Sequence, residues 1–457
     1  MIALPVVLIA VYMTTLDFFV ANLAVPSIRA GLGAGDAAVQ FVIAGYGLAY
    51  AAGLIVSGRL GDLYGHRRVF AAGLALFTVA SAACGLSPDA MSLVLARIAQ
   101  GAAAALLAPQ VLTLLRVLFE GAALARAFGW YGTAVGLAGV SGQAIGGLLV
   151  AADPLGMGWR ACFLVNVPIG AAALALTSRV LPRTPGAGDR RDLDLTGAAL
   201  VAAGLVAVVL PLIEGREEGW PPWTWLCLSA AAPLLAVFVR RQQRLMASGR
   251  APLLDVAVFA EKGFAGGLVA VALLFGTSAG LSFVLALYLQ SGLGLSPLAA
   301  GAVCTALNAG FFLTSLRAGR VPPAVAALVV VAGLAMLGYV VGRGAGPYLV
   351  AGALLVTGGG MGLLMSPLIS TVLSRVRRER AGAAAGVLGT VQETGGVLGG
   401  TVTGAAFFGA LDGGWVAATM AGLTVLVAGA LGVLAHCLVP SKPCPAAGAM
   451  IHVNQER

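Results

Sequence analysis

The chain of 457 residues is far more apolar than a water-soluble protein. Hydrophobic residues make up 60% of it and charged residues only 10%, whereas roughly a quarter of the residues in a soluble domain are charged. The mean hydropathy is +0.97. The formal net charge is +9, but the arginines are spread over many short connections. Because they form no basic stripe, we expect no nucleic-acid partner. Composition predicts an integral membrane protein.

Apolar segments long enough to cross a bilayer follow one another along the chain. A helix needs about 20 apolar residues to cross the hydrocarbon layer. Fourteen segments meet this requirement, which predicts an all-α membrane protein with fourteen transmembrane helices. They lie near residues 4–26, 38–58, 69–87, 90–114, 125–151, 161–181, 194–213, 223–239, 264–290, 297–316, 322–342, 346–372, 382–411 and 415–438.

Lysine and arginine give an independent test of this topology, because they concentrate in cytoplasmic loops near helix ends. With the N-terminus inside, all but five of the 27 basic residues fall on the cytoplasmic side. Arg97 lies within a span, and the four on the outside are Arg29, Arg160, Arg216 and Arg343. The bias predicts that both termini are cytoplasmic.

A faint internal repeat indicates two bundles. Arg59-Leu60-Gly61-Asp62 after the second span is echoed by Arg317-Ala318-Gly319-Arg320 after the tenth, and paired halves are common in transporters. We predict an N-terminal six-helix bundle (1–181), a linker with two additional helices (182–241), a cytoplasmic connection (242–262), a C-terminal six-helix bundle (263–438) and a cytoplasmic tail (439–457).

Charged residues within the spans are few, and each one is a candidate for function. A central Asp or Arg costs roughly 2.5–3.5 kcal/mol on insertion scales, yet Asp17, Glu393 and Arg97 lie inside apolar segments. A desolvated carboxyl can exchange protons as water access switches sides, so these residues are candidates for proton coupling. The alternative is an interhelical ion pair that only holds the bundle together.

Two glycine-rich spans allow helices to approach closely. Glycines recur at three- and four-residue steps in the fifth span, from Gly132 to Gly147, and in the thirteenth, from Gly395 to Gly404. Such faces permit tight packing, which suits either a static core or an interface that moves.

The connection between spans two and three combines glycines with acidic and basic residues. Its glycines allow a tight turn, Asp62 can face the N-terminus of the next helix, and the arginines can pair with carboxylates. The candidate gating loop consists of Gly58, Arg59, Gly61, Asp62, Gly65, Arg67 and Arg68. Candidates to line a substrate cavity are the polar and aromatic residues Asn22, Tyr46, Gln100, Gln110, Tyr131, Gln143, Tyr288, Gln290 and Asn308.

Taken together, these motifs resemble the fourteen-helix drug/proton antiporters of the major facilitator superfamily over nearly the whole chain. The similar stretches are Leu16-Asp17 with Asn22-Leu23-Ala24-Val25-Pro26 in the first helix, the loop from Gly58 to Arg68, Arg97-Ile98-Ala99-Gln100-Gly101 in the fourth helix, Trp159-Arg160, Phe163, Asn166-Val167-Pro168-Ile169-Gly170 and Tyr288-Leu289-Gln290.

Three stretches depart from the family pattern. Gly142-Gln143 stands where the family has Gly-Pro, so this chain lacks the family's proline at that position. The second gating loop, from Arg317 to Pro323, lacks an acidic residue. Where a related helix carries Arg-Gln before a double glycine, this chain has Gln392-Glu393, and the added carboxyl bears on coupling and cation preference.

The resemblance implies a bacterial inner-membrane exporter that rocks its two bundles and is driven by proton entry, with no cofactor besides the proton gradient. Its substrates would be hydrophobic drugs, antibiotics or secondary metabolites, and we expect a monomer surrounded by lipid. One alternative is a metabolite or peptide facilitator without tight proton coupling. A membrane-embedded enzyme is disfavoured, because the chain's three histidines have no paired spacing and no metal site is expected. A sensor would carry a soluble signalling domain, and the sequence shows none.

Overall fold

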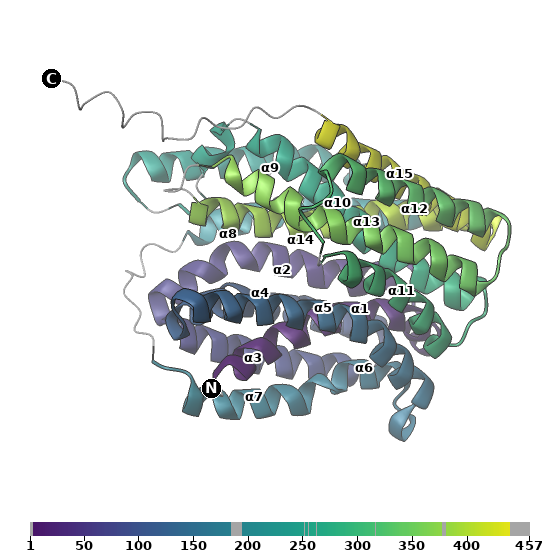
Figure 1. Cartoon of the computed structure of the whole chain (residues 1–457), viewed down its shortest axis with the longest axis horizontal. Coiled ribbons are helices and arrows are strands. Elements are labelled where there is room, and N and C mark those ends of the chain that lie inside the picture. The colour runs from purple at the N-terminus through teal and green to yellow at the C-terminus, as the bar shows by residue number, and fades with distance from the viewer. Residues whose placement is uncertain are drawn as a thin grey trace.

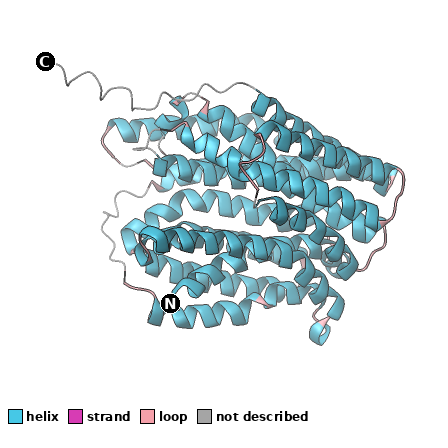
Figure 2. Ribbon diagram, in the orientation of Figure 1, coloured by secondary structure: helices cyan, strands magenta, loops and turns pink. Residues whose placement is uncertain are grey.

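The computed structural model describes residues 3–183, 194–250, 252–254, 256–261, 263–315, 317–376 and 381–438. These residues form helices and short connections, with no strand among them (Figure 2). Outside the described residues lie the predicted tail 439–457, most of the predicted linker at 184–193 and part of the connection between 251 and 262. The prediction of an all-α fold is confirmed for the described residues.

The first half of the chain forms one group of helices. It contains α1 (Ala3–Leu32), α2 (Asp36–Tyr64), α3 (His66–Gly85), α4 (Ala90–Leu118), α5 (Gly121–Ala152), α6 (Ala161–Leu164) and α7 (Asn166–Val180). The predicted sixth span is thus divided at Val165 into α6 and α7. The start of α4 is fixed by a capping box, in which Asp89 accepts a hydrogen bond from the Ser92 amide at 2.8 Å and Ser92 caps in return.

The second half begins with the predicted inserted pair, α8 (Leu195–Glu217) and α9 (Pro222–Ala247). It continues through α10 (Phe264–Leu287), α11 (Pro297–Ser315), α12 (Pro323–Gly342), α13 (Pro347–Ser374), α14 (Ala381–Gly409) and α15 (Trp415–Leu438). Proline occupies the first position of α9, α11, α12 and α13, where its missing N–H would have no helical partner. A π-helical turn, Tyr288–Gly292, follows α10 directly.

In the described part of the chain, 13 helices are long and apolar enough to cross a membrane. Helix α14 has 29 residues but is not among them. Its sequence is rich in glycine and threonine and includes Gln392 and Glu393. It packs against α2, α8, α10 and α15, so it can carry a less apolar sequence than a helix that faces lipid.

The predicted loop between spans two and three was wrong in its extent. Residues 58–64 continue α2, and the chain breaks only at Gly65, whose φ of 90° lies in the region that favours glycine. The polar residues after Gly58 therefore belong to the last turns of α2, where the helix leaves the apolar layer. The leucines between them, Leu60 and Leu63, favour helix, so the polar residues do not end it.

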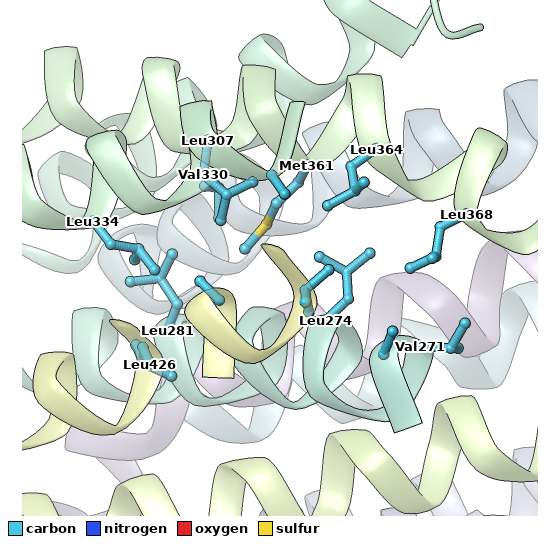
Figure 3. Packing of buried hydrophobic residues seen from close by; sticks show 14 of the residues in the cluster. Val271, Leu274, Leu281, Leu307, Val330, Leu334, Met361, Leu364, Leu368 and Leu426 are labelled. Carbon is cyan, nitrogen blue, oxygen red and sulfur yellow. The ribbon is translucent and has the colours of Figure 1, made fainter. Parts of the chain in front are cut away.

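The helices pack as two bundles side by side (Figure 1). Helices α1–α7 contact chiefly one another, and α10–α15 do the same, while α8 pairs with α9 and also touches α2 and α14. Leu274 and Leu281 of α10 belong to the buried core of the second bundle, together with Met361 and Leu364 of α13 (Figure 3). The bundles meet along the pairs α1–α10, α2–α14 and α5–α11.

Candidate functional site

A cavity of about 1410 Å³ lies between the two bundles. Its lining comes from α1, α2, α4 and α5 on one side and from α10, α11, α13 and α14 on the other. Most of the lining side chains are apolar or aromatic. The aromatic ones are Phe18, Phe19, Tyr46, Tyr50, Tyr131, Phe275, Phe283, Phe311 and Phe312. Its size and lining suit a drug-sized hydrophobic molecule.

One end of the cavity is closed by contacts between the bundles. Val25 and Val39 pack there with Phe283, Phe407 and Phe408 in a buried apolar cluster. Gln290 donates a hydrogen bond across the bundles to the Leu23 carbonyl at 2.8 Å, and the Arg29 guanidinium lies 5.9 Å from the Phe408 ring centroid. The lining continues instead to Ser315 and Ser374, at the C-terminal ends of α11 and α13.

Glu393 is the one residue with a formal charge among the described residues that line this cavity. It shares a face of α14 with Gly396, Val397 and Gly400, which also line the cavity. Within the described part of the chain, no hydrogen bond or ion pair reaches its carboxylate. The Glu393 side chain is half-buried, and the part of it that is exposed faces the cavity. A carboxylate in this position is accessible to water and to a bound molecule.

Asp17 and Arg97, in contrast, form an ion pair buried inside the first bundle. The Arg97 Nη1 donates to Asp17 Oδ2 at 2.5 Å, and both side chains are at most 1% exposed. Asp17 Oδ1 accepts from Gln100 Nε2 and Asn166 Nδ2, each at 2.9 Å. Ser81 Oγ lies 2.7 Å from Gln100 Nε2 and 3.0 Å from Asn166 Nδ2. This buried network joins α1, α3, α4 and α7.

Tyr46 separates the buried network from the cavity. Its ring centroid is 4.3 Å from the Arg97 guanidinium carbon, and the same residue lines the cavity. Arg97 Nε donates to the Val42 carbonyl at 3.0 Å, while its Nη2 has no partner among the described residues. Asp17, Arg97 and Glu393, which the sequence grouped together, therefore belong to two separate environments.

Asn166 and Ser81 are functional candidates that the sequence prediction missed. The signal for Asn166 was present, because it is a polar residue in an otherwise apolar stretch. Ser81 carried no such signal, since a lone serine in a helix usually bonds its own backbone.

The candidate gating residues gather at the junction of α2 and α3. Asp62 is 58% exposed and lies 4.0 Å from Arg59 and 3.8 Å from His66. Arg59 Nη2 donates to the Pro252 carbonyl at 3.3 Å, which ties this junction to the connection after α9.

The remaining gating residues hold the junction in place or stay at its surface. Arg67 Nη2 donates to the Ser178 carbonyl on α7 at 2.7 Å, and Arg68 is exposed. A Cβ on Gly61 would clash with the side chains of Gln110 and His66, whereas Gly58 faces open space.

Three of the nine predicted cavity residues line the cavity, namely Tyr46, Tyr131 and Asn308. The other six lie elsewhere. Asn22 bonds the Phe18 carbonyl, Gln100 belongs to the buried network, Gln110 bonds His66 and Ser57, Gln143 is buried at the α5–α11 contact, Tyr288 is 1% exposed in the second core and Gln290 bridges the bundles.

The predicted glycine faces form close helix contacts of two kinds. Gly147 of α5 lies against Pro297 of α11, so its contact joins the two bundles. Gly395 of α14 packs on Ala272 of α10 within the second bundle. On the other side of α14, Gly396 lines the cavity.

The inserted helix pair is fastened at one end by Asp194, which lies just before the apolar span of α8. Its carboxylate accepts hydrogen bonds from the Gly197 amide at 2.8 Å, Arg241 Nε at 2.7 Å and Gln242 Nε2 at 2.8 Å. Burial opposes ionisation of this carboxyl, but the hydrogen bonds and the Arg241 charge outweigh that effect and lower the pKa of Asp194. The carboxylate is thus held ionised at neutral pH.

Comparisons with known proteins place this arrangement among membrane transporters. A family model described as Major Facilitator Superfamily matches residues 7–400. The chain is 40% identical to a probable actinorhodin transporter of Streptomyces coelicolor, over 90% of this chain and 72% of that protein. It is 37% identical to the puromycin resistance protein pur8 of Streptomyces alboniger, over 94% and 88% of the two chains.

The fold is also similar to that of a solved POT family transporter, whose structure contains 5-aminolevulinic acid. The TM-score is 0.68 over 94% of this chain and 95% of that one, with 13% sequence identity. At this identity the likeness concerns the fold alone.

Proposed function

Because the chain belongs to the Major Facilitator Superfamily, we propose that it exports hydrophobic drugs, antibiotics or secondary metabolites by alternating access, driven by proton entry. The observation that carries the proposal is the cavity of about 1410 Å³ between the bundles, with its aromatic lining and single carboxylate. The names of the relatives, an antibiotic transporter and an antibiotic resistance protein, support the same substrate class.

Proton coupling is assigned by this proposal chiefly to Glu393, with Asp17 and Arg97 as a buried pair that supports it. Glu393 can take up and release protons through the cavity, because no ion pair within the described residues holds its charge. Asp17 is bound by Arg97, Gln100 and Asn166. Protonating Asp17 would leave a buried arginine without its counter-ion, which costs several kcal/mol.

The conformation follows from the proposed topology. With the N-terminus in the cytoplasm of a bacterial cell, α11 and α13 end on the cytoplasmic side, and so does the cavity that extends to Ser315 and Ser374. The apolar cluster around Phe283 and Phe408 then closes the outer side. This arrangement is an inward-open state that receives substrate from the cytoplasm or the inner leaflet.

Division of the chain follows the same proposal. Residues 1–181 and 263–438 act as the two rocking bundles, 182–241 adds the inserted pair, 242–262 connects them inside the cell, and 439–457 forms a cytoplasmic tail. The transporter works as a monomer in the inner membrane, with lipid around it and no cofactor.

The test is a resistance and accumulation screen in a bacterial host that lacks its own efflux pumps. Cells expressing the chain should survive raised concentrations of some hydrophobic compounds and accumulate less of them, and collapsing the proton gradient should abolish the difference. Glu393→Gln at equal membrane abundance should behave like the empty vector. The proposal fails if no compound in a broad panel is accumulated differently. A metabolite or peptide facilitator would instead give accumulation differences that persist without the proton gradient.

A further inference from the structure

We propose that the cavity selects organic cations, and that Glu393 and the tyrosines around it form their binding site. This inference rests on the proposed function and names the charge of its substrates. The observation behind it is a carboxylate that faces a large aromatic cavity without a counter-ion from the described residues.

The buried cation behind the cavity wall is already paired. Arg97, which lies behind Tyr46, is bound to Asp17 at 2.5 Å and to Gln100 Oε1 at 2.6 Å. Among the described residues, those that line the cavity include no lysine, arginine or histidine. Water can reach the Glu393 carboxylate through the cavity, but the apolar and aromatic walls solvate the charge less well than bulk water does. A positively charged substrate provides the missing partner.

Three tyrosines add aromatic surface to the cavity that Glu393 faces, and one of them, Tyr46, already contacts the Arg97 guanidinium. Tyr46, Tyr50 and Tyr131 lie within electrostatic range of Glu393, and all three line the cavity. The rings of Tyr46 and Tyr50 are stacked, with centroids 6.1 Å apart and planes inclined by 7°. Aromatic faces attract cations by about 0.5–2 kcal/mol each. Carboxylate and rings together therefore favour a cation over a neutral or anionic molecule of the same shape.

Helix α14 leaves space for a ligand in front of the carboxylate. Gly396 and Gly400 follow Glu393 at helical spacings of three and seven, on the cavity side. An added Cβ at either position would come no nearer to a neighbour than Ala279 Cβ, at 3.8 Å and 4.0 Å respectively. The α14 face thus carries no side chain at these two cavity positions, where an added Cβ would be in van der Waals contact with Ala279, while Val397 maintains the contact with Gly47 of α2.

The experiment compares two probes of the same shape and opposite charge. Tetraphenylphosphonium and tetraphenylborate are bound to the purified full chain in lipid nanodiscs, and neutral triphenylphosphine oxide reports on the cavity without charge. We expect the parent to bind the cation roughly 10- to 100-fold more tightly than the anion, as one close ion pair and one or two ring contacts imply. Glu393→Gln should lose that preference and keep its affinity for the neutral probe, and Glu393→Asp should retain most of it.

Two further variants separate charge from packing. Tyr131→Leu should weaken cation binding several-fold, roughly as the loss of one ring contact implies, whereas Tyr131→Phe should not. Glu218→Gln, which removes an exposed carboxylate outside the cavity, is the control and should bind like the parent.

Equal affinity for the two charged probes, or an unchanged preference in Glu393→Gln, would overturn the inference. Export of neutral compounds alone would support the proposed function and refute cation selection. Glu393-dependent cation binding without any export would support cation selection and refute the proposed function.

Discussion

Replacing Asp17 by asparagine should destabilise the first bundle. The carboxylate accepts hydrogen bonds on both oxygens, from Arg97 on Oδ2 and from Gln100 and Asn166 on Oδ1. Asparagine has one oxygen and one NH₂ group, so the NH₂ must face at least one N–H donor. The Arg97 charge also loses its counter-ion in a site that is 0% exposed. Breaking a buried pair in this way costs about 3–5 kcal/mol.

A double-mutant cycle measures the pair itself. Arg97→Met removes the charge and keeps an apolar stem beneath Tyr46, and the double variant Asp17→Asn with Arg97→Met leaves no buried charge at the pair. We expect each single variant to unfold at a clearly lower temperature in mild detergent. The double variant should be less impaired than the sum of the two, by roughly 0.5–3 kcal/mol of coupling free energy. Membrane abundance should follow the same order.

The reasoning would be refuted by a stable Asp17→Asn variant. If it unfolds like the parent yet exports substrate without proton movement in proteoliposomes, then Asp17 carries the proton and its hydrogen bonds contribute little to stability. If it unfolds like the parent and transports normally, neither role holds.

Three other perturbations probe the closed end of the cavity, the α2–α3 junction and the inserted helix pair. Gly147→Val would bring a Cβ within 2.6 Å of the Pro297 carbonyl oxygen, so it should open the closed end of the cavity and raise the labelling of a cysteine placed there. Gly352→Val, which has open space around it, is the control and should not change the labelling. Equal labelling in the two variants would contradict this prediction. Asp62→Asn should change the free energy of unfolding by less than about 1 kcal/mol, because the carboxylate is exposed, but it should lower the transport rate. Full transport in this variant would show that Asp62 has no role in gating. The lowered pKa of Asp194 means that its stabilising contribution is present at neutral pH and is lost as the pH falls below about 4. Asp194→Asn should therefore flatten the dependence of unfolding temperature on pH in that range, and an unchanged curve would contradict the proposed role of Asp194 in fastening the inserted helix pair.

Local patterns in the amino-acid sequence are sufficient to predict the membrane fold. Spans follow from runs of apolar residues, and their ends from proline, glycine and arginine. The same patterns predicted too long a loop at the α2–α3 junction, because polar residues at a helix end resemble a loop when the neighbouring helices are unknown. Helix α14 was predicted as a span although it is not among the 13 described helices that are apolar enough to cross a membrane, and its packing against α2, α8, α10 and α15 explains why its sequence is tolerated.

The partners of the charged residues, in contrast, depend on how the helices pack. Asp17 and Glu393 look alike in the sequence, as single carboxyls in apolar helices. Folding places Asp17 against Arg97, 80 residues away, and leaves Glu393 facing a cavity lined by residues from both bundles. The difference depends on which helix faces meet, and hydropathy does not encode that, because an apolar side chain is accommodated equally well against lipid and against another helix.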